Sequence, residues 1–198
     1  MQGSGRKIKI VEVSRLTTER YVNLFKMTYK DKEDQEKTWT YASRNDPPKA
    51  DTGNFASPDA IIIVPFHEAS GKLVIIKEFR IPLADYLYGF PAGLVDDGES
   101  VEDCAKREFE EETGMQLSRV IRTSPPIYSS SGLTDESIVM VYATCTGQAS
   151  DGNTGSAEEI ETIFVSPEEA RALCARQEIR FDVKTWLVLY AFGIDGQL

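Results

Sequence analysis

The sequence predicts one mixed α/β domain of the α+β kind, with a small extension, and two observations support this. Segments with alternating or β-rich composition come first, and helix signals appear only from residue 100 onward. The resulting order of strands, helix, strands and two helices differs from the regular βαβ array of a doubly wound sheet. The length of 198 residues fits this organisation.

The N-terminal strands are predicted from alternation and from β-branched or aromatic residues. We expect strands over residues 7–13, 20–30 and 37–43, and the charged stretch 31–36 forms the turn between the last two. The segment from Pro47 to Gly53 predicts a loop.

The remaining strands lie before and after the first predicted helix. Residues 59–66 and 72–80 predict a second hairpin around Ser70-Gly71, and residues 137–145 and 160–165 predict further strands. Residues 147–157 are rich in Gly, Ser, Asn and Asp, which is typical of a surface loop.

Each predicted helix carries its own start signal. The first begins after the capping residue Ser100 and ends at Gly114, a residue suited to a left-handed C-terminal cap. The second begins with 166–169 (Ser-Pro-Glu-Glu), which places a capping Ser before a Pro at the first helical position. The third begins at Asp182 and is apolar enough to be a core helix.

Charge and rare residue types exclude several classes of protein. The chain has 32 Asp+Glu against 22 Lys+Arg, a net charge of −10, which argues against binding nucleic acid or anionic membranes through bulk charge. Cys104, Cys145 and Cys174 show no C-x-x-C spacing and His67 is the one histidine, so a zinc site is not expected. Without a signal region or an apolar run of roughly 18 residues, a cytoplasmic location is expected.

The first helix carries the candidate chemistry. Glu108, Glu111 and Glu112 are spaced i, i+3 and i+4, so they share one helix face. Three carboxylates on one face repel each other, and a hard divalent cation such as Mg²⁺ would offset that repulsion. The alternative is a solvated acidic face, which is common on surface helices.

The residues around these glutamates form a longer motif, G-x5-E-x7-R-E-U-x-E-E-x-G-U, where U is bulky and apolar. Its seven fixed positions, at roughly 7% each, would match by chance with a probability on the order of 10⁻⁸. The motif is filled by Gly93, Glu99, Arg107, Glu108, Phe109, Glu111, Glu112, Gly114 and Met115. It resembles the Nudix box, and the chain resembles Nudix hydrolases, which cleave a nucleoside diphosphate linked to another moiety.

This resemblance implies a Nudix fold, in which a mixed β-sheet is sandwiched between helices and the box forms a loop–helix–loop. It implies that Glu108, Glu111 and Glu112 hold metal ions, with Mg²⁺ expected and Mn²⁺ as the alternative. The metals would bridge phosphate oxygens and help to deprotonate the attacking water, with Glu111 counted among the catalytic residues. The backbone carbonyl of Ala92 is a further metal ligand in the subgroup described below.

Other residues of the box would support these ligands. Arg107, which we also count as catalytic, and Glu99 are expected to orient the carboxylates. Gly93 would let the chain turn where a side chain would collide with metal or phosphate.

Outside the box, roughly residues 10–195 resemble the ADP-ribose pyrophosphatases. Residues 77–80 (Lys-Glu-Phe-Arg) with Pro82 resemble the x-x-F-R-x-P strand end of that subgroup, and residues 90–93 (Phe-Pro-Ala-Gly) resemble its entry to the box. Arg80 is then an implied phosphate contact, since a guanidinium can bind phosphate through two N–H groups. The alternative for Arg80 is an ordinary surface arginine.

In that subgroup the N-terminal strands form an antiparallel β sub-domain that pairs with the partner subunit. The resemblance therefore implies a homodimer with swapped N-terminal strands, a dimerisation sub-domain over residues 1–56 and a Nudix hydrolase domain over residues 57–198. Tyr21 and Trp39 would clamp the base, and Arg44 would reach the phosphates across the dimer. The alternative is that the two aromatic residues are packed strand residues.

Two positions depart from the subgroup pattern. Gly89 stands where the subgroup has an acid, and Ser131 stands where it often has a proline. Both positions touch the sugar side of the site, which leaves another nucleoside diphosphate sugar as an alternative substrate.

The base that activates water comes from a loop glutamate in relatives. Glu136, Glu158 and Glu159 are the candidates here. We favour Glu159 as the base, with Glu136 as a substrate or metal contact, because a loop carboxylate suits gating. For each, the alternative is a solvated loop acid.

Together these features predict a Mg²⁺-dependent pyrophosphohydrolase of ADP-ribose or a related nucleoside diphosphate sugar. Its products would be a nucleoside monophosphate and a sugar phosphate. The alternatives are a Nudix domain that binds a nucleotide sugar without cleaving it, and a hydrolase of dinucleoside polyphosphates, coenzyme A or oxidised nucleotides. The expected partners are the substrate and a second copy of the chain, not nucleic acid or membrane.

Overall fold

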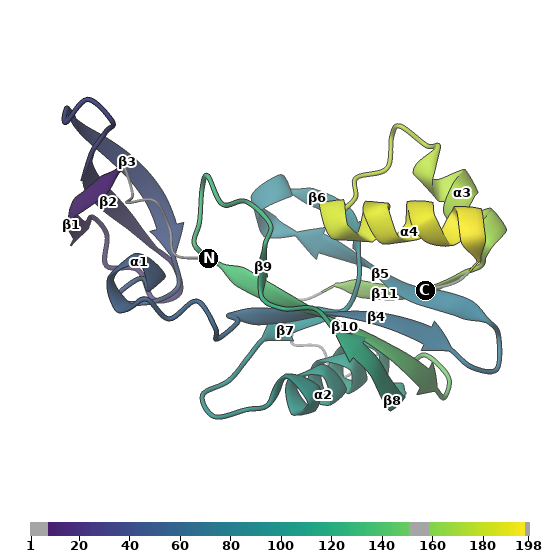
Figure 1. Cartoon of the computed structure of the whole chain (residues 1–198). Helices are drawn as coiled ribbons and strands as arrows, with labels where there is room; N and C mark the ends of the chain where they lie inside the picture. The colour runs from purple at the N-terminus through teal and green to yellow at the C-terminus, as the bar shows by residue number, and fades with distance from the viewer. Residues whose placement is uncertain (1–7, 151–158, 197–198) are drawn as a thin grey trace. The chain divides into compact units, whose positions relative to one another are not determined.

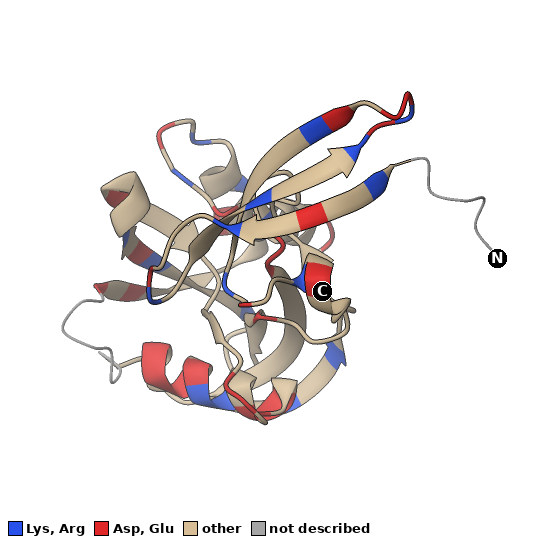
Figure 2. Cartoon of the chain, turned by 90° about the vertical axis from the view of Figure 1, so that its left-hand side faces the viewer, with Lys and Arg blue, Asp and Glu red and all other residues tan. Residues whose placement is uncertain are grey.

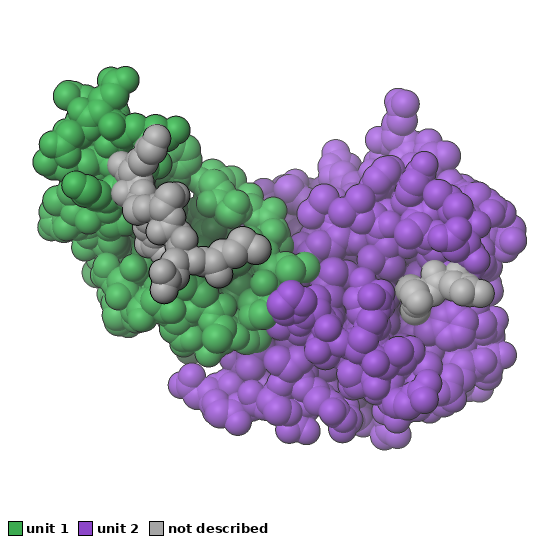
Figure 3. Space-filling view, in the orientation of Figure 1, with its two compact units in different colours: residues 1–59, 126–137 green, residues 60–125, 138–198 purple. Residues whose placement is uncertain are grey.

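The computed structural model describes residues 8–150 and 159–196. Its contacts divide the chain into two compact units, which Figure 3 shows in green and purple. Unit 1 comprises residues 1–59 and 126–137, and unit 2 comprises residues 60–125 and 138–198. The boundary after residue 56, drawn from the sequence, stays a prediction about which part carries dimerisation.

Unit 1 is built around an antiparallel sheet in the order β1-β2-β3, as the sequence predicts. Its strands are β1 (Lys9–Arg15), β2 (Asn23–Lys30) and β3 (Glu36–Ser43). The unit also holds the short helix α1 (Lys49–Thr52) and the short strand β9 (Ile127–Tyr128). Helix α1 falls in the segment predicted as a loop, and Gly53 ends it in the left-handed conformation with φ 70°.

Unit 2 is built around a mixed sheet in the order β11-β5-β4-β10-β8 (Figure 1). Its strands are β4 (Ala60–His67), β5 (Lys72–Arg80), β8 (Gln116–Thr123), β10 (Ser137–Thr146) and β11 (Ile160–Val165). The central pair, β4 and β10, is parallel, whereas β5 pairs antiparallel with β4 and β11, and β8 antiparallel with β10. The sequence analysis did not predict β8, nor two short strands that extend this sheet: β6 (Asp85–Gly89) pairs with β5, and β7 (Ala92–Leu94) pairs with β4.

Helices cover both faces of this sheet. Figure 1 shows α2 (Val101–Thr113) on one face and α3 (Pro167–Cys174) with α4 (Val183–Asp195) on the other. The predicted caps Ser100 and Ser166 are confirmed: Ser100 accepts a hydrogen bond from the backbone N–H of Asp103, and Ser166 belongs to a capping box. Asp182, predicted as the start of the last helix, is the N-cap of α4. The sheet sandwiched between helices is therefore confirmed.

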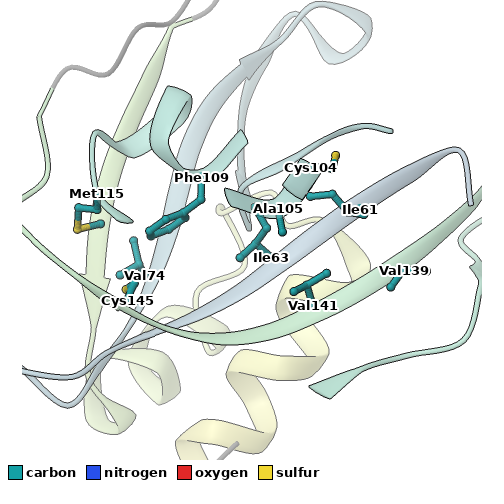
Figure 4. Close-up of a cluster of buried hydrophobic side chains, with 10 residues drawn as sticks. All are labelled: Ile61, Ile63, Val74, Cys104, Ala105, Phe109, Met115, Val139, Val141 and Cys145. Carbon is teal, nitrogen blue, oxygen red and sulfur yellow. The ribbon is translucent and has the colours of Figure 1, made fainter. Parts of the chain in front are cut away.

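The buried face of α2 fixes the helix against the sheet. Figure 4 shows Phe109 of α2 pointing toward Ile63 and Val74, and Phe109 is fully buried. Full burial of an aromatic side chain stabilises the folded state by about 2 to 3 kcal/mol. This packing fixes the rotation of α2 about its axis, so it determines which residues point away from the core.

No helix in the described part of the chain is long and apolar enough to cross a membrane.

Candidate functional site

Helix α2 is rich in acidic residues, most of them exposed or partly buried. In Figure 2, α2 is the helix at the bottom of the molecule, and the red of acidic residues runs along most of it. Glu108 and Glu112 are partly buried and Glu111 is exposed, and their i, i+3, i+4 spacing places the three predicted ligands on the side of the helix next to the buried Phe109. Glu110 is exposed and lies outside this set.

The carboxylate of Glu108 lies where a side chain of Gly93 would lie. Gly93 belongs to β7 and pairs with Ile61 of β4, which fixes its backbone against the sheet. A Cβ atom built on Gly93 would lie 1.8 Å from Cδ of Glu108. A glycine is therefore required at this position for Glu108 to hold its place.

Arg107 connects the loop before α2 to the helix itself. Its Nε and Nη2 atoms donate to the two carboxylate oxygens of Glu99, each at 2.9 Å. Its Nη1 atom donates to Oε1 of Glu108 at 2.7 Å and lies 3.5 Å from Oε2 of Glu111, and Nη2 also donates to the carbonyl of Leu94 at 3.2 Å. The guanidinium thus holds Glu99 and Glu108 in one hydrogen-bonded group.

The two carboxyl groups bonded to Arg107 have pKa values that are shifted in opposite directions. Hydrogen bonds from Arg107, together with the backbone N–H of Asp96, lower the pKa of Glu99 to about 2. Burial raises the pKa of Glu108 above its usual value; Arg107 opposes that rise, and the charge of Glu111 adds to it. The charged form of Glu108 is therefore disfavoured by burial and favoured by its hydrogen bond from Arg107.

Glu112 reaches back to the strand before the box. The backbone N–H of Ala92 donates to Oε2 of Glu112 at 3.3 Å, which places this carboxylate beside the residue whose carbonyl is the fourth predicted ligand. Across residues 8–150 and 159–196, no three acidic, histidine or cysteine side chains converge into a ready metal-binding group. The structure thus gathers Glu108, Glu112 and Ala92 where β7 and α2 meet, with one oxygen of Glu108 bonded to Arg107 and one oxygen of Glu112 bonded to the backbone of Ala92.

A second group of predicted site residues lies at one end of β5. The backbone N–H of Phe79 donates to the carbonyl of Glu159 at 3.1 Å, so Glu159 lies beside the residue that precedes Arg80. Arg80 donates through Nη1 to Oε1 of Glu78 at 2.8 Å. The structure therefore brings Arg80 and Glu159 to the same end of the sheet, whereas Glu158 lies outside the described residues.

Tyr86 joins this second group, and the sequence analysis missed it. It lies on β6 opposite Phe79, and its hydroxyl donates a hydrogen bond to Oε1 of Glu159. A single tyrosine in a short strand gives no sequence pattern that would predict this role. The contact becomes visible only once β6 is seen to pair with β5.

Unit 1 brings together three of the four predicted residues that it contains. Arg44 donates through Nε to Oε1 of Glu136, and Nε1 of Trp39 donates to the carbonyl of Gly132 at 3.1 Å, so both contact the 130–136 loop. Tyr21 is 65% exposed, and the Arg20 guanidinium lies 4.9 Å from the centre of its ring. Tyr21 and Trp39 are exposed aromatic residues, not packed core residues.

A buried ion pair that the sequence analysis missed supports the same loop. Lys49 is 3% exposed; its Nζ atom lies 2.7 Å from Oδ2 of Asp59 and donates to Oγ of Ser137 at 2.6 Å. Its backbone N–H donates to Oδ2 of Asp135 at 2.9 Å. Lys49 therefore fixes the residues on either side of Glu136, and a lysine within a predicted loop gave no sequence signal of this role.

Comparison with known proteins gives a family and several relatives. A family model described as the NUDIX domain matches residues 56–187. The chain is 31% identical over 191 residues to the ADP-sugar pyrophosphatase of Mus musculus, covering 88% of this chain and 81% of the mouse protein. It is 28% identical over 145 residues to the ADP-ribose pyrophosphatase of Saccharomyces cerevisiae, covering 71% of this chain and 61% of the yeast protein. A crystal structure of an ADP compounds hydrolase shares the fold, with a TM-score of 0.73, 18% identity and coverage of 99% and 98% of the two chains.

Proposed function

The chain belongs to the Nudix family, and on that premise we propose that it hydrolyses the diphosphate of ADP-ribose or a related nucleoside diphosphate sugar. The products would be a nucleoside monophosphate and a sugar phosphate. The observation that carries the proposal is the complete box, in which Gly93 leaves the space that the carboxylate of Glu108 occupies. The names of the mouse and yeast relatives support the substrate class.

Nudix hydrolases generally require a divalent metal, and the donor set of this chain fits one. Glu108, Glu111, Glu112 and the carbonyl of Ala92 would supply hard oxygen ligands, which suit Mg²⁺ and also Mn²⁺. The burial of Glu108 and the space left by Gly93 fit a carboxylate directed at a cation. When bound, such a cation lowers the pKa of water and neutralises charge on the diphosphate.

The residues of the chain then have separate roles. Arg107 and Glu99 hold Glu108 in place. Arg80 would exchange its hydrogen bond with Glu78 for one to phosphate. Glu159 would accept a proton from the attacking water, whose oxygen bonds to one phosphorus while the bridging oxygen leaves with the other phosphoryl group.

We further propose that the chain acts as a homodimer with swapped N-terminal strands. The support is the exposed apolar surface of strand β1, where Ile10 and Val11 are about half exposed. In that dimer Tyr21 and Trp39 would stack on the base, and Arg44 would reach the phosphates of the other subunit. A monomeric mass in solution at micromolar concentration would overturn this arrangement.

The activity is tested with a panel of nucleoside diphosphate sugars, assayed with Mg²⁺ or Mn²⁺ for release of the nucleoside monophosphate. We expect turnover of ADP-ribose or a related sugar nucleotide, loss of turnover with a chelator, and loss in Glu112→Gln. Glu110→Gln is the matched control, since Glu110 is an exposed glutamate of the same helix outside the acidic face. Tight binding without turnover would favour a sensing domain, and turnover of coenzyme A or dinucleoside polyphosphates alone would replace the proposed substrate class.

A further inference from the structure

The contact between Tyr86 and Glu159 fixes a carboxylate whose backbone is already anchored. The carbonyl of Glu159 accepts the backbone N–H of Phe79 at 3.1 Å, and the next residue, Ile160, pairs with Glu78 of β5. The position of the Glu159 backbone is thus set by the sheet. The direction of its side chain is set by the hydroxyl of Tyr86, which donates to Oε1.

The ring of Tyr86 is itself held from two sides. It packs edge to face on Phe79, with ring centroids 5.4 Å apart and an interplanar angle of 79°. The Nζ atom of Lys77 lies 4.7 Å from the ring centroid, within the range of a cation–π interaction. Because both contacts come from the neighbouring strand β5, the hydroxyl is aimed at Glu159 by packed elements.

The charges around this contact favour a neutral phenol as the donor. The hydrogen bond to Glu159 raises the pKa of Tyr86, and the negative charges of Glu159, Asp85 and Glu161 raise it further. Tyr86 therefore keeps its proton at neutral pH and can only donate that proton to the carboxylate. Among the cations of β5, Lys77 lies 3.4 Å from Glu161 and Arg80 is paired with Glu78.

We propose that Tyr86 is a positioning residue that fixes the carboxylate of Glu159 for proton abstraction. The proposal rests on the proposed function, in which Glu159 is the base. The hydroxyl of Tyr86 bonds to Oε1 and leaves Oε2 to take the proton of water as the water oxygen bonds to phosphorus. Without Tyr86 the exposed side chain of Glu159 would sample other rotamers, and its carboxylate would be oriented toward the attacking water in a smaller fraction of molecules.

The kinetic test uses Tyr86→Phe, which removes the hydroxyl and keeps the ring contacts. We expect kcat for the best sugar nucleotide to fall on the order of tenfold with KM within about twofold of wild type. In the Glu159→Gln background the same change should cost less than about twofold, because Tyr86 acts through Glu159. Tyr88→Phe is the matched control, since Tyr88 lies on the same strand and its ring packs against Phe181, with centroids 5.7 Å apart. An unchanged kcat in Tyr86→Phe, or equal losses in both backgrounds, would overturn the proposal.

A second measurement tests the contact without any turnover. Tyrosine labelled with ¹³C at Cζ gives a titration for each phenol, and the resonance lost in Tyr86→Phe identifies Tyr86. We expect Glu159→Gln to lower the pKa of Tyr86, because it removes the main cause of the rise. An unchanged titration would show that the contact does not form in solution and would overturn the proposal even in an active enzyme. If wild type cleaves no diphosphate, the proposed function fails, and the positioning role fails with it whatever the titration shows.

Discussion

The Cβ position of Gly93 lies 1.8 Å from Cδ of Glu108, so the two residues cannot both carry side chains at this place. Gly93 is fixed in β7 by pairing with β4, and Glu108 is fixed on α2 by the burial of Phe109. Neither backbone can move away without disturbing the core, so an added methyl group must displace the carboxylate.

Gly93→Ala is therefore expected to abolish most of the activity while the fold survives. The side chain of Glu108 is flexible and would turn aside, so we expect kcat for a sugar nucleotide to fall on the order of a hundredfold. The control is Gly71→Ala: a Cβ there meets no atom within 4 Å, but the positive φ of 65° makes the change strained. This control should lose about 1 kcal/mol of stability and keep its activity. Full activity in Gly93→Ala would show that Glu108 does not act from this position.

Arg107 is expected not to tolerate replacement by lysine. A single ammonium cannot reproduce the paired bonds to Glu99 together with the bond to Glu108, so the loop and the helix would lose their common anchor. We predict a loss of kcat/KM of about 10- to 100-fold in Arg107→Lys, measured by product release. Lys106→Arg on the same helix, where Lys106 pairs with Glu102 at the surface, should be neutral. Equal activities of the two variants would contradict the role given to Arg107.

The sequence was sufficient for the parts of the fold and site that are contiguous in the chain. Helix α2 begins and ends where Ser100 and Gly114 predict, because caps are local hydrogen-bonding signals. The acidic face of α2 follows from helical spacing alone. The fixed motif from Gly93 to Met115 likewise identified the family that residues 56–187 match.

The sequence was insufficient where a role depends on which strands pair. Strands β6 and β7 have five and three residues, too few for a periodic pattern to stand out. As a result Tyr86 could not be connected to Glu159, although the two are 73 positions apart in sequence and hydrogen-bonded in the structure. The same holds for Lys49 and Ser137, which are 88 positions apart.

The two loop glutamates are expected to differ in their kinetic effects. Glu159→Gln removes the proposed base, so kcat should fall by about 10² to 10⁴ with KM little changed. Glu136→Gln instead weakens the hydrogen bond that holds Arg44, so we expect mainly a higher KM, by about tenfold. Steady-state kinetics on the best substrate separates the two, and a large loss of kcat in Glu136→Gln with none in Glu159→Gln would reverse the assignment.

The buried pair of Lys49 and Asp59 is expected to stabilise unit 1. Their side chains are 4% and 8% exposed, so removing one charge leaves the other buried without its partner. We predict that Asp59→Asn lowers the free energy of unfolding by about 3 kcal/mol. The control is Asp34→Asn, whose exposed pair with Lys30 should contribute less than about 1 kcal/mol. Both changes are compared in the Trp186→Phe background, where Trp39 is the remaining tryptophan. Denaturation followed through Trp39 then measures the unfolding of unit 1.

The pair of Lys49 and Asp59 should also make the stability of unit 1 decrease at low pH. Burial alone would raise the pKa of Asp59, but hydrogen bonds from Lys49, the backbone of Ser137 and Asn45 lower it below 3.8. A group whose pKa is lowered by folding stabilises the folded state above its unfolded value and loses that contribution as the pH falls through its folded value. The stability difference between wild type and Asp59→Asn should therefore be constant from about pH 5 to pH 7 and shrink only as the pH falls below 3.8. A difference that grew as the pH fell would mean that Asp59 is protonated in the folded protein and that Lys49 is held by other groups.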